Sequence, residues 1–117
     1  MQYKFSGNIN FPTAQWQEAT KFYKDVLGLQ EGNSQPTYSH LKSDNFHIYF
    51  EGDTSVPGPI FEFLVPDFEA AKDDLVAAGC TVMRWDGPGK SNYVRDPFGF
   101  TFNVFEDKSP FQNERQA

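Results

Sequence analysis

An internal repeat constrains the fold of this chain more than any other feature of its sequence. A short alternating run, NINF, precedes Pro12 and a helical pattern, and a second alternating run, IFEFLV, precedes Pro66 and another helical pattern. Pro12 and Pro66 are 54 residues apart, whereas the pairs Tyr38–Tyr93 and Glu51–Glu106 are each separated by 55 residues. A period near 54 that preserves the order of the elements predicts two copies of one structural unit.

Each copy is predicted to contain a strand, a helix and three further strands. The first helix has Thr13 as its candidate N-cap and ends at Gly28, while the second has Asp67 as its N-cap and ends at Gly79. The last two strands of each copy form a hairpin, TYSHLK with FHIYFE and SNYVRD with FTFNVFE. We therefore predict an α+β fold of two βαβββ modules, whose strands form a mixed-sheet cup with the helices on its convex side.

The length of 117 residues predicts a single domain. Within it, module one spans residues 3–51 and module two spans residues 60–106. A linker rich in Gly and Pro, residues 52–59, joins the modules, and residues 107–117 form a polar, frayed tail. Neither module is expected to bury the apolar stripe of its helix alone, so the modules must pair.

The charge and cysteine content narrow the possible partners. A formal net charge of -6 repels nucleic-acid phosphates and anionic lipid headgroups, and it favours neutral or cationic ligands. No apolar run approaches the length of a membrane span, and the N-terminal residues MQYKFSGN lack a secretory signal. Cys80 is the single cysteine, so an intrachain disulfide is excluded. We expect a cytoplasmic protein with a buried structural thiol.

Three segments together resemble the vicinal oxygen chelate superfamily, which includes glyoxalase I, extradiol dioxygenases and bleomycin-resistance proteins. They are FYKDVLGL, VPDFEAAKDDLVAAG and DPFGFTFNVFE, and the resemblance extends from about Phe5 to Glu106. It implies the fold described above, a ligand site in the cup and a homodimer. Because this scaffold carries many chemistries, the resemblance leaves the reaction open.

The resemblance also implies positions for metal ligands on the first and last strands of each module. These positions fall on Asn8, Ile48, Ile60 and Asn103. Two aliphatic side chains and two amides do not form the set of imidazole, thiolate or carboxylate groups that Zn, Fe or Ni requires. A shift of two residues would bring Asn10 or Glu62 into play without assembling three strong ligands. We therefore predict no metal and no cofactor.

The alternation of side chains along the strands assigns further residues to the cup. Phe46, Phe50 and Phe105 are predicted to form its apolar walls, and Asn8, Asn10 and Asn103 its polar part. These amides either recognise a ligand or bond to loop backbone. Glu62 is predicted to face the cup between Ile60 and Leu64. There it orients a cationic ligand, acts as a general base, lies exposed at the rim, or pairs with a Lys or Arg.

The two histidines, His40 and His47, are predicted to share the opposite face, which packs toward the helix. The segment WDGPGKS lacks the spacing of a phosphate-binding loop. The sequence also indicates no Ser-His-Asp triad and no base partner for Cys80, so we do not expect nucleophilic catalysis.

Three functions remain open. The first is a metal-free protein that binds a small cationic or aromatic molecule without changing it. The second is a glyoxalase-, lyase- or isomerase-type enzyme that uses an atypical metal set or Glu62 as a base. The third is a domain that acts mainly through its partner interface. These functions include both an enzyme and proteins that only bind a partner or ligand.

Overall fold

Both halves of the chain fold in the predicted order of strand, helix and three strands. The computed structural model describes residues 1–112. It divides into two units: one contains residues 7–61, and the other contains residues 1–6 together with the residues from Glu62 onward. The first half contains β1 (Lys4–Pro12), α1 (Trp16–Asp25), β2 (Gln30–Glu31), β3 (Tyr38–Ser43) and β4 (Phe46–Glu51). The second contains β5 (Ile60–Val65), α2 (Phe68–Ala77), β6 (Thr81–Trp85), β7 (Asn92–Arg95), β8 (Thr101–Glu106) and α3 (Ser109–Gln112). The predicted α+β class with two βαβββ modules is confirmed.

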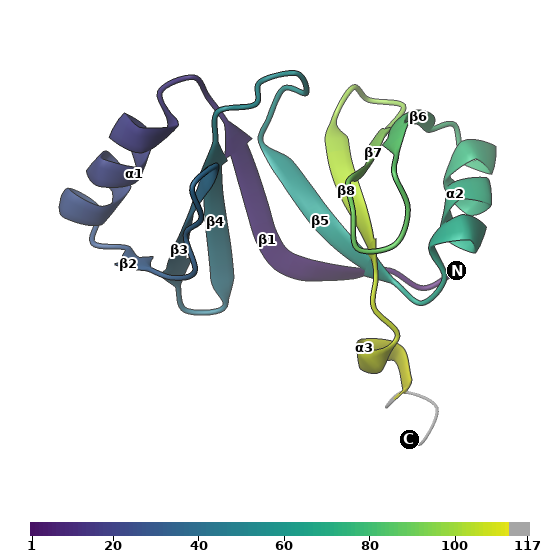
Figure 1. Ribbon diagram of the computed structural model, residues 1–117. Helices are drawn as coiled ribbons and strands as arrows, with labels where there is room; N and C mark the ends of the chain where they lie inside the picture. The colour runs from purple at the N-terminus through teal and green to yellow at the C-terminus, as the bar shows by residue number, and fades with distance from the viewer. Residues whose placement is uncertain (113–117) are drawn as a thin grey trace. The chain divides into compact units, whose positions relative to one another are not determined.

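The strands of the two modules follow the same order. In module one the order is β2-β3-β4-β1, with β3 and β4 antiparallel and β1 and β4 parallel (Figure 1). In module two the order is β6-β7-β8-β5, and β7 is antiparallel to both β6 and β8. The parallel pairing of β1 with β4 requires a long crossover connection, which α1 and the β2–β3 segment provide.

The two helices start in different ways. The Asp67 carboxylate accepts a hydrogen bond from the Ala70 backbone nitrogen at 3.1 Å, so the predicted N-cap of α2 is confirmed. The prediction for Thr13 is wrong. The N-cap position of α1 is Gln15, whose side chain makes no capping bond, and Thr13 Oγ1 accepts a hydrogen bond from the Gln15 backbone nitrogen at 3.2 Å. The Thr13 side chain therefore stabilises the turn before the helix.

Each module has its own packed interior. In module two, Val65, Ala71, Val94 and Val104 form a cluster without solvent exposure. In module one, the Tyr23 ring of α1 packs on Phe50 of β4 with centroids 4.9 Å apart, and the hydroxyls of Thr20 and Ser39 are 2.6 Å apart. The C-terminal end of α1 and the two residues that follow it are less covered than the apolar pattern predicts, because Phe22, Val26 and Leu27 are 51%, 64% and 53% exposed.

The segment after β8 differs from the predicted polar, frayed tail. Ser109–Gln112 form α3, the Phe111 side chain is buried, and the Lys4 ammonium lies 5.8 Å from the centroid of its ring. The remainder of the predicted tail, residues 113–117, lies outside the described residues. No helix among residues 1–112 has the length and apolar character that crossing a bilayer requires.

Candidate functional site

The predicted faces of the β3–β4 hairpin are reversed in the structure. Phe50 packs on Tyr23, and Ser39, which pairs with Phe50 across the hairpin, contacts Thr20 of α1. Phe46 and Ile48 alternate with Phe50 on the same, helix-facing side. The prediction that Phe46, Ile48 and Phe50 line the ligand-binding face is therefore wrong.

The physical reason is an error of one residue in the register by which the last strand of module one was matched to that of module two. Pairing Glu51 with Glu106 implied a period of 55 along the last strands, which matched Ile48 to Asn103. The helix-facing residues show a period of 54, because Phe50 of β4 corresponds to the buried Val104 of β8. A slip of one residue moves every side chain of a strand to the other face. Tyr49, not Ile48, is thus the counterpart of Asn103.

On the face of module one that lies opposite α1, four aromatic or imidazole rings lie next to one another in a row. Tyr38 and Tyr49 have centroids 5.8 Å apart, and Tyr49 stacks on His40 at 4.7 Å with an interplanar angle of 9°. His40 and His47 stack at 5.0 Å and 24°. We call these four residues the ring row. The prediction that His40 and His47 pack toward the helix is wrong, for the same register reason.

The hydrogen bonds of His40 determine its protonation. Its Nδ1 accepts a hydrogen bond from the Asn33 backbone nitrogen at 2.8 Å, and its Nε2 lies 2.7 Å from Nδ1 of His47. An imidazole that accepts at Nδ1 carries its proton on Nε2, so His40 donates to His47. Burial first, and then His47 and Lys42, hold the pKa of His40 below its ordinary value. His40 is a neutral, fixed part of the ring row.

Glycine at position 32 allows this placement of the His40 ring. A Cβ atom at Gly32 would lie 2.4 Å from Nδ1 of His40 and 2.6 Å from its Cε1 atom. The Gly32 backbone nitrogen also donates to the His40 carbonyl at 2.7 Å. The loop before β3 therefore packs its backbone directly against one edge of the ring row.

Two of the predicted amides lie beside the ring row, on β1. In the parallel pairing of β1 with β4, Asn8 is opposite His47 and Asn10 is opposite Tyr49. Asn10 Nδ2 donates to Glu51 Oε1 at 2.7 Å, whereas its Oδ1 is buried and has no hydrogen-bond partner among the described residues. A buried acceptor without a partner is costly, so this oxygen favours a ligand or water that donates to it.

Module two brings together two other predicted residues. Asn103 Nδ2 donates to Glu62 Oε2 at 3.0 Å, and Asn103 Oδ1 accepts from the Asn92 backbone nitrogen at 2.9 Å. Phe105 shares the Asn103 face of β8, because Phe102 and Val104 pack into the core on the other face. The assignment of Glu62, Asn103 and Phe105 to the face away from α2 agrees with this geometry. Ile60, at the start of β5, is buried.

The donor atoms do not fit the metal set that the family resemblance implies. Among residues 1–112, no group of three or more His, Cys, Asp and Glu side chains is arranged to hold a metal ion. The side chains at the metal positions include the amides of Asn8 and Asn103, and both ring nitrogens of the nearby His40 are engaged in hydrogen bonds. We therefore derive no chemistry through a metal ion.

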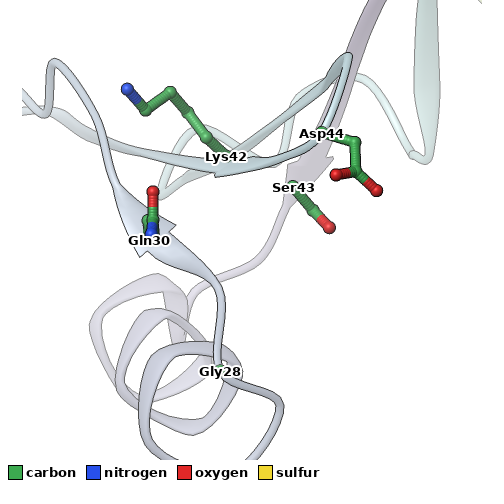
Figure 2. Close-up of a pocket in the computed structure, with 5 residues that line it drawn as sticks. All are labelled: Gly28, Gln30, Lys42, Ser43 and Asp44. Atoms are coloured by element: carbon green, nitrogen blue, oxygen red, sulfur yellow. The ribbon is translucent and has the colours of Figure 1, made fainter.

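Module one has a pocket at each end of the β3–β4 hairpin. The first, of about 440 Å³, is lined by Gly28, Gln30, Lys42, Ser43 and Asp44. Figure 2 shows the Lys42 and Asp44 side chains extending in different directions, so its charged groups do not converge on one point. The second, of about 580 Å³, is lined by Trp16, Pro36, Thr37, Glu51, Gly52 and Asp53. The second pocket adjoins the ring row, because Glu51 of the pocket is the strand partner of Tyr38.

Comparison with solved structures identifies the class of fold. A glyoxalase/bleomycin resistance protein/dioxygenase superfamily member from Vibrio splendidus 12B01 aligns with a TM-score of 0.67 at 17% identity, covering 91% of this chain and 99% of that chain. The Mn(II)-bound glyoxalase from Novosphingobium aromaticivorans aligns with a TM-score of 0.64 at 16% identity, covering 91% of this chain and 40% of that one. At such identities the likeness concerns the fold, which is that of the vicinal oxygen chelate superfamily.

The sequence itself assigns the family. The family model described as the glyoxalase-like domain matches residues 8–105. The chain therefore belongs to the glyoxalase-like domain family, and the predicted superfamily is confirmed. A search of curated protein sequences finds no significant match.

Sequence reasoning missed the ring row and the pocket beside Trp16. The interval of 54 residues between Pro12 and Pro66 was the signal for the correct faces, since the same interval along β4 and β8 places His47, Tyr49 and Glu51 opposite the helix. Trp16, the first residue of α1, lines the pocket at the start of that helix.

Proposed function

We propose that this protein binds a small organic molecule on the ring row of module one without the help of a metal ion. The observation that carries the proposal is the stacking of Tyr38, Tyr49, His40 and His47 on the face opposite α1. Aromatic walls with a few fixed polar groups are typical of small-molecule sites. The Asn10 amide, with its buried oxygen, supplies such a polar group next to Tyr49.

Stacking and burial of apolar area would supply most of the affinity. A planar ligand that extends the row gains about 0.5–1.5 kcal/mol per ring contact beyond the area it buries. Because His40 is hydrogen-bonded at both ring nitrogens, the row is ordered before the ligand arrives, and a preordered surface loses less entropy on binding.

Quinoline, a planar molecule that is uncharged near neutral pH, is a suitable probe of the ring row. We expect it to bind and to shift the NMR resonances of Tyr49 and His47. Replacing Tyr49 with Leu keeps an apolar side chain but removes the ring, and should weaken binding about three- to tenfold. The matched control is Phe98→Leu at the exposed turn of module two, where the ring is 83% exposed. Equal binding by wild type and Tyr49→Leu would refute the proposal.

A second candidate function is supported by Glu62. Its carboxylate is held at 3.0 Å by Asn103, and Asn103 is itself held by Asn92, so Glu62 has the fixed position that a general base needs. This function is an isomerase- or lyase-type reaction with Glu62 accepting the proton. Turnover that is lost in a folded Glu62→Gln variant would support it.

Metal analysis of the purified protein tests the metal-free part of the proposal. We expect substoichiometric Zn, Ni, Mn and Fe. Near-stoichiometric metal that is lost together with turnover would favour the enzyme with an atypical ligand set.

We further propose that the protein is a cytoplasmic homodimer that binds neither nucleic acid nor membranes. The exposed apolar residues Phe22, Val26 and Leu27 support a subunit contact at α1, and the net charge of -6 opposes binding to phosphate-rich partners. Sedimentation of the purified chain tests the oligomeric state: a monomer at all concentrations would exclude the dimer.

A further inference from the structure

The pocket beside Trp16 has walls of two chemically different kinds. The indole of Trp16 and the ring of Pro36 are apolar, whereas Glu51 and Asp53 contribute carboxylates. Its volume of about 580 Å³ falls within the usual range of small-molecule sites. All six lining residues belong to the unit of residues 7–61, so the pocket is built within one module.

The backbone of Gly52 fixes the indole in this pocket. A Cβ atom at Gly52 would lie 3.0 Å from Cδ1 of Trp16 and 3.1 Å from its Nε1 atom. The indole ring therefore lies directly against the chain at the end of β4. Glu51 and Asp53, the residues on either side of Gly52, line the same pocket as the indole.

Each of the two carboxylates accepts a hydrogen bond from a neutral group. Glu51 Oε1 accepts a hydrogen bond from the Asn10 amide at 2.7 Å, and Asp53 Oδ1 accepts one from the Ser55 backbone nitrogen at 3.0 Å. Among residues 1–112, no ion pair involves Glu51. A hydrogen bond from an amide orients a carboxylate but leaves its negative charge in place.

We infer that this pocket binds an organic ammonium group, such as the quaternary ammonium of choline. A cation over an indole face is attracted by the negative face of the ring, and neighbouring carboxylates add Coulomb attraction. The acidic net charge of the chain raises the local concentration of cations further. Anions are disfavoured by Glu51 and Asp53, and neutral ligands gain nothing from their charges.

This inference rests on the proposed function, because it assigns the charged part of a ligand whose planar part would lie on the ring row. Glu51 pairs with Tyr38 across the hairpin, so the pocket and the first ring of the row are neighbours. One ligand that carries both an ammonium group and a planar ring would occupy both parts.

Choline and its neutral isostere neohexyl alcohol, in which carbon replaces nitrogen, test the pocket alone. We expect choline, titrated by NMR at low salt, to shift the amide resonances of Gly52 and Asp53 and to bind at least about threefold more tightly than neohexyl alcohol. Added salt should weaken the binding of choline, because it screens the partly exposed carboxylates. Equal binding of the two compounds would overturn the inference.

Two variants that preserve shape test the carboxylates. Asp53→Asn and Glu51→Gln keep the acceptor oxygens of the observed hydrogen bonds and remove one charge each, so each should weaken choline binding about two- to fivefold. The control Asp44→Asn removes one negative charge at the other end of the hairpin and should leave choline binding unchanged. The backbone φ of Asp44 is 52°, a conformation that Asn tolerates. Equal losses in all three variants would overturn the inference, because they would indicate a general charge effect.

Quinoline separates failure of the pocket from failure of the proposed function. If quinoline binds and choline does not, the ammonium site is refuted and the ring-row function stands. If choline binds in the pocket and quinoline does not bind, the ring-row function is refuted, and the pocket is a cation site without the planar subsite.

Discussion

Asn103 Nδ2 donates a hydrogen bond to Glu62 Oε2 at 3.0 Å, which joins the last strand of module two to its first strand. The amide orientation is determined by the second bond, in which Asn103 Oδ1 accepts from the Asn92 backbone nitrogen. Module one contains the counterpart with the two roles exchanged: Asn10 on β1 donates to Glu51 on β4. Each module thus has a carboxylate oriented by an amide from another strand.

Asn103→Asp should destabilise the protein at neutral pH. The substitution removes the donor to Glu62 and places a second carboxylate next to it, at an expected cost of about 1–3 kcal/mol in the free energy of unfolding. Acidification should recover part of this loss, because one of the two carboxyl groups then binds a proton. Urea denaturation at neutral and mildly acidic pH measures both effects. Asn45→Asp, at the exposed β3–β4 turn, is the matched control. An equally small effect of both variants would contradict the stabilising role of the bond between Asn103 and Glu62.

Asn92→Ala should be among the most destabilising single substitutions in module two. The Asn92 side chain is fully buried, accepts from the Gly87 backbone nitrogen, and donates to the carbonyls of Gly87, Lys90 and Val104. Its removal leaves buried backbone groups without partners, at an expected cost of about 2–4 kcal/mol. Thermal unfolding measures the loss, and faster amide exchange at Gly87 should accompany it. Amide exchange at Gly87 that does not change would show that the loop is held by other contacts.

The stability of the folded chain should fall on acidification through the ordinary titration range of histidine. Burial holds the pKa of folded His40 below its ordinary value of 6.5, so the unfolded chain binds a proton there at higher pH than the folded chain does. The stability that the neutral imidazole contributes is therefore present above pH 6.5 and is lost as the pH falls through the folded pKa.

Replacing His40 with Gln tests this dependence, because it removes the titrating group. The free energy of unfolding of the variant should be lower than that of wild type near neutral pH, and it should change less between neutral and mildly acidic pH. Urea unfolding at a series of pH values measures the slope. A variant with the wild-type slope would assign the pH dependence to other groups.

Cys80 should react slowly with alkylating reagents in the folded chain. Burial, followed by the negative charge of Asp96, raises the pKa of the Cys80 thiol, so the reactive thiolate is scarce near neutral pH. We expect iodoacetamide to modify the native chain much more slowly than the chain in denaturant, with mass spectrometry as the measurement. Equal rates in the two conditions would contradict the predicted protection.

The predicted elements of module two agree closely with the structure, because its local signals and its packing favour the same arrangement. Asp67 caps α2, and the Asp96 carboxylate accepts hydrogen bonds from the Phe98 and Phe100 backbone nitrogens in the turn before β8. The alternation that follows this turn places Asn103 and Phe105 on one face and Val104 on the other, as predicted. The local sequence signals of module two were therefore sufficient to predict its elements and the two faces of β8.

The sequence by itself determined the doubled βαβββ order, because turn residues and hydrophobic periods are local properties of the chain. Only the tertiary structure decided which face of the β3–β4 hairpin meets α1, since FHIYFE carries rings on both faces and its alternation alone does not choose between them. The choice depends on the packing of Phe50 against Tyr23, which lie far apart in the chain. That packing places His40, His47 and Tyr49 together, and with them the candidate site.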